Sequence, residues 1–359
     1  MSESSSTDAA AVPRSTAVPG HRHAHANAAA SHSRLPIWLA IVFALACGGL
    51  TALQSRINGE LAGAIGDPHT AAAISFGSGL VILFVALAVW RPGRRGLGRI
   101  VDAVRGGHLA WWMALGGLAG AWFVTTQGLS ASVVGVALFT IAIVAGQTIG
   151  GVLFDLVGLG PGGRRPLTVP RVLGAVLALA AIVWAVSAQV ARDVPFLLMV
   201  LPLVAGVGAA WQQAINGRVR SVARSALTAT VVNFAVGTAA LVVVMVAHAA
   251  SVGWPTSMPS DWWLYAGGAL GCVFIAAQAV LVRITGVLVL ALCGVAGQLA
   301  TALALDLLAP TSGRGVDAST IGGTALALVA VVIASIRWSR HRHVAPSASR
   351  PEASLRTRE

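Results

Sequence analysis

The chain has 359 residues, of which 56% are hydrophobic and only 10% are charged. Soluble domains carry about 25% charged residues, so this composition argues against a single globular domain surrounded by water. The formal net charge of +12 comes from 24 arginines without any lysine, a balance that on a soluble protein would suggest nucleic acid as a partner.

The chain begins with a segment rich in Ala, Ser, Pro and His, residues 1–34, which lacks the apolar centre of a signal peptide. We expect a disordered cytoplasmic tail here, and a second one at residues 339–359. Four histidines of the first tail could bind a metal ion transiently, although a solvated tail is the simpler interpretation. They are His21, His23, His25 and His32.

Between the tails, the apolar residues fall into ten continuous runs separated by short polar links. A hydrocarbon core about 30 Å thick requires about 20 helical residues, so each run predicts one membrane-spanning helix. Continuous runs favour helices, because membrane strands would alternate apolar and polar residues. The expected spans are 36–56, 70–90, 108–128, 133–157, 170–189, 195–213, 226–249, 262–281, 286–308 and 320–337.

Arginines are distributed unevenly between the two sides of this predicted bundle. If the N-terminus is cytoplasmic, 21 of the 24 arginines lie on the cytoplasmic side, and only Arg56, Arg192 and Arg314 lie outside. This distribution satisfies the positive-inside rule. We therefore expect both termini in the cytoplasm, attribute the basic charge to topology and contact with anionic lipid, and expect no nucleic acid partner.

The chain also contains an internal repeat, in which unlike residue types recur with their order and spacing kept. Gln54, Ile57, Asn58, Gly59, Ser75, Phe76 and Gly79 recur 158 positions later as Gln212, Ile215, Asn216, Gly217, Asn233, Phe234 and Gly237. Gly116-Gly117, Gly120, Gln127, Gly135, Gly146-Gln147 and Asp155 recur 151 positions later as Gly267-Gly268, Gly271, Gln278, Gly286, Gly297-Gln298 and Asp306.

Each repeat contains five expected spans, the first within residues 35–190 and the second within residues 191–338. Because five is an odd number, the second repeat must enter the membrane from the opposite side. Inverted repeats are common in secondary transporters, which hold their substrate between the halves near the midplane. We predict an all-α membrane protein with ten transmembrane helices arranged as two inverted five-helix repeats.

The repeated motifs resemble those of the YdcZ-like branch of the drug/metabolite transporter superfamily, over residues 36–337. The resemblance rests on Gln-x-x-Ile-Asn-Gly and Ser/Asn-Phe-x-x-Gly in each half, and on Gly-Gln ahead of an Asp. Asp155-Leu-Val-Gly158 is similar to the family's Asp-x-x-Gly, whereas Asp306 is followed by Ala309 in place of that glycine. The resemblance implies a ten-helix fold with a central cavity lined mainly by the first, third and fourth helices of each half.

Side-chain amides are the main polar groups inside the predicted spans. A polar residue in a membrane is costly unless it faces protein or water, and an amide can both donate and accept hydrogen bonds. The candidates for lining a substrate cavity are therefore Gln147, Gln298, Gln54, Gln212, Gln127 and Gln278. The alternative is that these side chains only hold the helices together.

Two carboxylates and two asparagines are candidates for coupling or gating. Asp155 and Asp306 lie at mirrored span ends, where partial burial could raise the pKa of a carboxylate for proton coupling; the alternative is an interfacial residue that pairs with Arg. Asn58 and Asn216 could gate an entrance, but with the glycine that follows each of them we expect helix caps.

The leading hypothesis is a secondary transporter of a small metabolite or drug-like compound, embedded in the bacterial inner membrane and surrounded by lipid. The alternatives are an integral-membrane enzyme or lipid-handling protein, and a non-transporting scaffold. Nucleotide-binding, metalloprotease and hydrolase motifs are missing from the sequence, so we expect neither enzyme activity nor a cofactor or metal. The sequence leaves homodimerisation open.

The charge distribution generates a first prediction, about topology. Reporter fusions at the N-terminus and at the C-terminus should both report a cytoplasmic location, because each tail is rich in arginine and an even number of spans separates them. Paired fluorescent-protein and phosphatase fusions measure this directly. Termini on opposite faces of the membrane would contradict the ten-span inverted arrangement.

Overall fold

The structure is a computed structural model, which describes residues 36–164, 166–190, 195–310 and 316–335. Both expected tails, and Arg192 and Arg314, lie outside these residues. The regular structure of the described residues is helical throughout. The α-helices are α1 (Ile37–Ile65), α2 (Pro68–Val89), α3 (Arg91–Arg105), α4 (Gly116–Thr126), α5 (Ser132–Val134), α6 (Val136–Val157), α7 (Val169–Val190), α8 (Phe196–Ala223), α9 (Ala226–Val252), α10 (Gly267–Leu308) and α11 (Ala318–Ser335). Two short 3-10 helices, η1 (Trp111–Leu115) and η3 (Trp262–Tyr265), and a π-helix, η2 (Gln127–Ala131), complete the set.

The turn between α1 and α2 illustrates how local sequence sets a helix end. Gly66 adopts a φ of 75°, a conformation that glycine tolerates and that ends α1. Asp67 then caps α2, because its carboxylate accepts hydrogen bonds from the backbone amides of His69 and Thr70. Pro68 follows in the first turn, where its missing N–H costs nothing. The two helices are therefore joined by a tight, well-defined turn.

Six of the described helical segments are long and apolar enough to cross a membrane, namely α1, α2, α6, α8, α9 and the last part of α10. Shorter apolar stretches lie in α7, α11 and the first part of α10. Large apolar side chains point outward from these helices, including Val85 at 62% exposure and Val183 at 70%. Water would not tolerate so continuous an apolar surface, whereas lipid favours it. The chain is therefore an all-α membrane protein.

The expected span at 108–128 is interrupted in the structure. It is divided among η1, the 11-residue helix α4 and the π-helical turn η2. The chain then passes through Gly135 at a φ of 88° before α6 begins. The wider π turn directs Gln127 into the protein interior, where its side chain is completely buried. The apolar pattern predicts the span but cannot predict this local departure from α-helical geometry.

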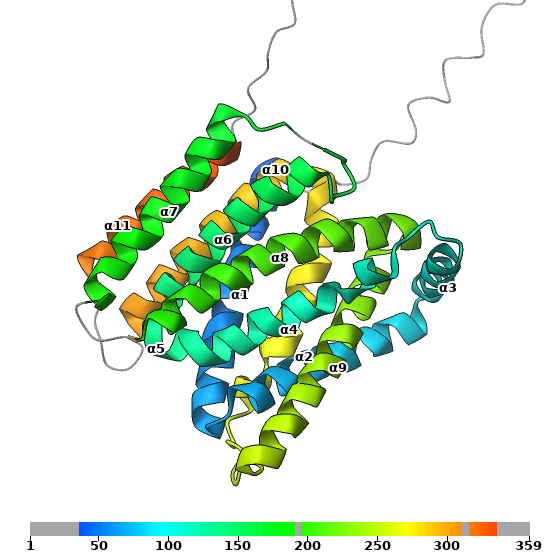
Figure 1. Cartoon of the computed structure of the whole chain (residues 1–359), viewed down its shortest axis with the longest axis horizontal. Helices are drawn as coiled ribbons and strands as arrows, with labels where there is room; N and C mark the ends of the chain where they lie inside the picture. Colours follow the sequence, from blue (N-terminus) through cyan, green and yellow to red (C-terminus); the bar gives the residue numbers. More distant parts are fainter. Residues whose placement is uncertain (1–35, 165, 191–194, 311–315, 336–359) are drawn as a thin grey trace, which may run out of the picture. The chain divides into compact units, whose positions relative to one another are not determined.

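The two spans expected within residues 262–308 belong to one continuous helix, α10. A straight helix of 42 residues would be about 63 Å long. Gln54 Nε2 nevertheless donates to Gly267 O at 2.9 Å, and Arg56 Nη1 donates to Ala309 O at 2.8 Å. Both ends of α10 thus meet the same turn of α1, so its axis folds back on itself. In Figure 1, the yellow first part and the orange last part of α10 accordingly run as separate segments.

Helices of the first predicted half pack mainly against helices of the second. α1 lies along α10, α2 along α9, and α6 along α8, and α7 lies beside α11 (Figure 1). By their contacts, the described residues from Ile37 to Ser335 form one packed unit. The two predicted repeats therefore interlock within that unit.

Glycines bring two of these helix pairs into direct backbone contact. A Cβ atom at Gly297 of α10 would overlap the carbonyl oxygen of Leu45 in α1. A Cβ atom at Gly146 of α6 would overlap the carbonyl oxygen of Leu203 in α8. The sequence repeat relates the second pair to the first, so equivalent residues make equivalent contacts. Small residues of this kind allow the close helix approach that stabilises membrane bundles.

The expected helix caps at Asn58-Gly59 and Asn216-Gly217 are wrong. Both pairs lie inside helices, since α1 continues to Ile65 and α8 continues to Ala223. The asparagine side chains form tertiary hydrogen bonds to other helices and make no local turn. The glycines remain in helical geometry, where the absence of a side chain lets a neighbouring segment approach.

The packing of α10 on α1 generates a prediction about stability. Gly297→Ala should destabilise the protein by about 1–3 kcal/mol, because the added methyl group overlaps the Leu45 backbone and forces the helices apart. The measurement is the apparent unfolding temperature of the purified protein in detergent.

Gly294→Ala, one turn earlier on the same helix, is the matched control. A Cβ atom at Gly294 meets no atom within 4 Å, so this variant should unfold at the wild-type temperature. Equal unfolding temperatures for the two variants would contradict the described contact.

Candidate functional site

A buried hydrogen-bond network links α1 to the π turn of the third expected span. Gln127 Oε1 accepts a hydrogen bond from Asn58 Nδ2 at 2.7 Å, and Gln127 Nε2 donates one to Ser55 Oγ at 2.8 Å. Asn58 Oδ1 and the neighbouring Ser75 Oγ are buried and have no hydrogen-bond partner within the described part of the chain. Unpaired buried groups are costly, and both oxygens could accept a further hydrogen bond.

The second half carries a related network. Gln212 Nε2 and Asn216 Nδ2 both donate to Asn233 Oδ1, at 2.9 Å and 3.1 Å. Gln278 is the repeat equivalent of Gln127, but its side chain lies outside what the structure describes. Five of the predicted glutamines and asparagines, three from the first half and two from the second, therefore form hydrogen bonds in these networks or between helices. They are Gln54, Asn58, Gln127, Gln212 and Asn216.

The contacts between the halves are reciprocal. When one residue of the first half contacts one of the second, their repeat equivalents in several cases contact each other as well. Gly267 lies against Asn58 while Gly116 lies against Asn216, and Phe76 stacks on its own equivalent Phe234 with ring centroids 4.7 Å apart. The sequence repeat is therefore matched by a repeat in the contacts.

The two carboxylates that the sequence places at mirrored positions lie in different surroundings. Asp306 is 7% exposed and accepts hydrogen bonds from the first two backbone amides of α6, at 3.1 Å and 2.7 Å, with Arg56 Nη1 3.8 Å away. It therefore balances the positive end of the α6 dipole. Asp155 is partly exposed and pairs with Arg171 at 3.0 Å. The environment of Asp306 thus combines pairing with Arg and capping of another helix.

Gln147 and Gln298 lie beside the close helix contacts. Gln298 is 6% exposed, and its Nε2 has no hydrogen-bond partner among the described residues, whereas Gln147 is partly buried. Gly146 and Gly297 precede these glutamines and hold α6 on α8 and α10 on α1 in backbone contact. Such tight packing leaves little free volume around either glutamine.

A cavity of about 780 Å³ lies away from these glutamines, between the end of α2, the turn joining α8 to α9, and the first part of α10. Its apolar lining includes Leu83, Trp90 and Ile275, and two cations, Arg220 and Arg224, also line it. The family resemblance implied a cavity along the first, third and fourth helices of each half. The described cavity is lined by the ends of α8 and α2, the start of α9 and the first part of α10, which correspond to one first, two second and one third expected span.

Several cavity residues differ in burial from their repeat equivalents. Thr230, Cys272 and Ile275 line the cavity and are partly buried, whereas their equivalents Ala72, Ala121 and Val124 are buried. Leu83, Cys272 and Ile275 also pack in the same apolar cluster as these equivalents. The cavity residues Trp90, Ser225 and Leu227 correspond to His248, Asp67 and His69.

The last three equivalents form a cluster that the sequence did not indicate, Asp67 with His69 and His248. Burial opposes the ionisation of Asp67, but hydrogen bonds from Thr70 and His69 and the nearby charge of His248 outweigh it and hold the pKa of this carboxyl below its ordinary value. No local motif marks these residues, because one side chain is a helix cap and the others lie at span ends. They can be found by taking the residues that line the cavity and locating their equivalents in the other repeat.

The comparisons with known proteins agree with the membrane fold. The sequence matches the family described as "Putative inner membrane exporter, YdcZ" over residues 39–184 and 197–333. Inner membrane protein YdcZ of Escherichia coli (strain K12) is 34% identical over 76 residues, which are 21% of this chain and 48% of that protein. The match thus spans about half the length of this curated relative. One solved structure, titled "Crystal structure of protein", aligns with a TM-score of 0.49 and 20% sequence identity. The alignment covers 83% of this chain and 96% of that chain.

The surroundings of the two carboxylates generate a prediction. Asp306→Asn should destabilise the protein by about 1–3 kcal/mol, because the amide oxygen can accept only one of the two backbone hydrogen bonds and the NH₂ group would face the other buried donor. Asp155→Asn is the matched change at the repeat equivalent and should cost at most about 1 kcal/mol, because it removes a partly exposed ion pair. Unfolding in detergent measures both, and an equal or reversed order would contradict the capping role of Asp306.

Proposed function

We propose that this chain, which belongs to the YdcZ family of inner membrane exporters, is a secondary transporter that moves a small metabolite or drug-like compound by alternating access. The chain is a multi-pass protein of the inner membrane, and its family indicates a transporter. The transported compound, the alternating mechanism and the direction of export are the proposed part.

The contrast between the cavity and its repeat equivalent is the observation that carries the proposal. A transporter built from two similar halves needs one conformation in which a space opens on one side while the corresponding space on the other side is closed. Ile275, which lines the cavity, and its buried equivalent Val124 differ in this way, and both pack in one apolar cluster. Exchanging the two packings would move the opening to the other side.

Reciprocal contacts support the exchange. Because equivalent residues contact each other across the interface, as Phe76 does with Phe234, the two alternative arrangements can use nearly the same contacts. Two arrangements of similar free energy are what a carrier requires, since it must populate both during a cycle. A scaffold without transport activity has no need for this balance.

The size and chemistry of the cavity favour a small amphiphile as the transported compound. Its volume of about 780 Å³ suits a drug-sized molecule. The apolar side chains of Leu83, Trp90 and Ile275 would contact an apolar body, and Arg220 and Arg224 would attract an acidic or strongly polar group. Both arginines lie in a link that the positive-inside rule assigns to the cytoplasm, so the cavity would receive its cargo from the cytoplasm for export.

The test first needs a substrate. Metabolite profiles of a deletion strain and of an overexpressing strain should differ in the exported compound, and uptake of that compound into proteoliposomes then gives a direct assay. Failure of both strains to differ in any compound, followed by no uptake of candidate amphiphiles, would contradict the proposal.

The role of the cavity is tested with two variants of α10. Ile275→Trp should reduce transport by more than tenfold, because the indole fills space that the substrate occupies, a loss of more than about 1.4 kcal/mol of binding. Val273→Trp, two residues away with a side chain that is 55% exposed outside the cavity lining, should leave transport unchanged. Equal activity of the two variants at equal protein levels would show that this cavity is not the pathway.

A further inference from the structure

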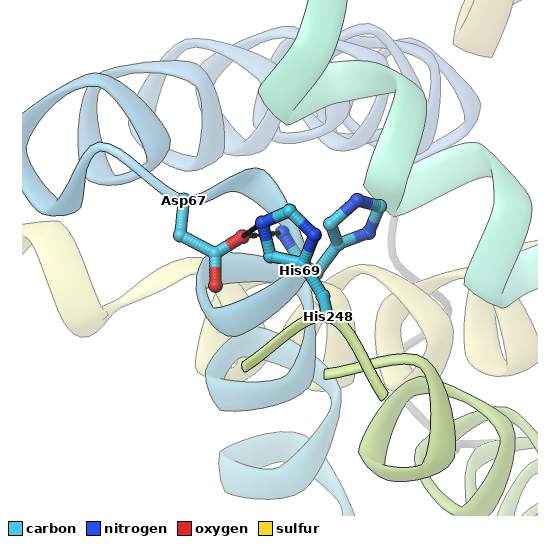
Figure 2. Close-up of side chains that lie close together, drawn as sticks. All are labelled: Asp67, His69 and His248. Atoms are coloured by element: carbon cyan, nitrogen blue, oxygen red, sulfur yellow. Dashed lines mark hydrogen bonds and ion pairs between the residues drawn. The ribbon is translucent and has the colours of Figure 1, made fainter. Parts of the chain in front are cut away.

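Three potential metal ligands converge where α2 begins and α9 ends. Asp67 caps the first turn of α2, His69 lies in that turn, and His248 lies near the end of α9. Figure 2 shows the two imidazole rings side by side, with the Asp67 carboxylate directed toward them. One ligand atom from each residue can be chosen so that all three lie within 4.8 Å of one another.

The distances leave only small movements between this cluster and a metal-binding geometry. His248 Nε2 lies 3.8 Å from Asp67 Oδ1, and the two imidazole centroids are 4.7 Å apart with a tilt of 57°. Ligand atoms bound to one tetrahedral ion at about 2.0–2.2 Å would lie about 3.3–3.6 Å apart. Rotations of the two histidine side chains that displace their ring nitrogens by about 1 Å are sufficient to close this difference.

The carboxylate is held in place before any ion binds. Asp67 is 7% exposed, and its two oxygens accept hydrogen bonds from the His69 amide at 2.9 Å, the Thr70 amide at 3.3 Å and the Thr70 hydroxyl at 2.5 Å. Each oxygen of a carboxylate has further lone pairs, so this cap does not consume its capacity as a ligand. Hydrogen bonds from a second layer of residues also orient the ligands of known metal sites.

One imidazole nitrogen of the cluster lacks a partner. His69 Nδ1 is buried and forms no hydrogen bond within the described residues. A buried nitrogen without a partner costs free energy, which coordination to a metal ion would recover. By contrast, the His248 side chain is 35% exposed, so an ion can reach the cluster from solvent.

We propose that Asp67, His69 and His248 bind a divalent transition-metal ion of the zinc type through one carboxylate oxygen and two imidazole nitrogens. Two imidazoles favour Zn²⁺ and related ions over Mg²⁺ and Ca²⁺, which prefer oxygen ligands alone. With three protein ligands, the fourth position is left to water, so the ion is exchangeable.

Binding of the ion would join the start of α2 to the end of α9. The three ligands are the repeat equivalents of residues that line the open cavity, so an ion here would hold the opposite opening shut and slow the transport cycle. This regulatory consequence rests on the proposed function, whereas the binding of the ion does not.

The binding test uses the full chain in detergent with its six tail histidines replaced by alanine, because those residues could bind metal themselves. They are His21, His23, His25, His32, His341 and His343. Titration with Co²⁺, followed by its visible absorption, and competition with Zn²⁺ should show one ion per chain. His248→Ala in this background should weaken binding by more than about tenfold, since even the loss of a residue behind a ligand costs about 10–100-fold.

His108→Ala is the matched control, because His108 is the third histidine left in this background and lies outside the cluster. His69→Ala provides a second test, and unfolding temperatures without metal verify that each variant is folded. Absence of Co²⁺ binding by the background protein, or equal affinity for the background, His69→Ala and His248→Ala, would overturn the proposal.

A flux assay separates the two levels of the proposal. Zn²⁺ should inhibit transport by the background protein and lose this effect in His248→Ala. If Zn²⁺ binds through His248 but flux is unchanged, the site stands and its regulatory role is wrong. If no substrate is transported by any variant, the proposed function fails while the binding data still decide the site.

Discussion

Where α10 crosses α1, and where α6 crosses α8, no side chain separates the two backbones. Gly297 faces the Leu45 carbonyl, and Gly146 faces that of Leu203. Lipid provides no hydrophobic force between helices, so the packing of such small residues has to hold the halves together. It also sets their register, and the register decides which polar side chains meet. The cavity lies among the ends of α2 and α8, the start of α9 and the first part of α10.

The sequence predicted the features that depend on composition and on repetition. Apolar runs located the helices, and the repeat placed Asn58 and Asn216 at equivalent positions that make equivalent glycine contacts. The features it could not predict arise from tertiary contacts. The asparagines were expected to end their helices because their local preference favours a cap, yet hydrogen bonds to Gln127 and Asn233 keep them inside. The periodicity of apolar residues in the sequence likewise does not indicate the fold-back of α10 or the π turn at Gln127.

Equivalent residues do not have equivalent surroundings, and this difference makes the two halves of the structure unequal. Gly135 breaks the chain before α6, whereas its equivalent Gly286 lies within the continuous helix α10. Asp306 caps a neighbouring helix, whereas Asp155 forms a partly exposed ion pair. The repeat supplies two similar halves, and these departures from symmetry give equivalent residues different surroundings in the two halves.

Hydrogen bonds from the start of α6 to Asp306 hold that end of the helix in place. Arg56 of α1 lies beside the same carboxylate, so α1, α6 and α10 are tied together at one point. The 22 residues of α6 extend about 33 Å from this point. Pro161, in the segment just beyond the far end, lines the cavity. One helix therefore connects the Asp306 anchor to the cavity over a distance close to the thickness of a hydrocarbon core.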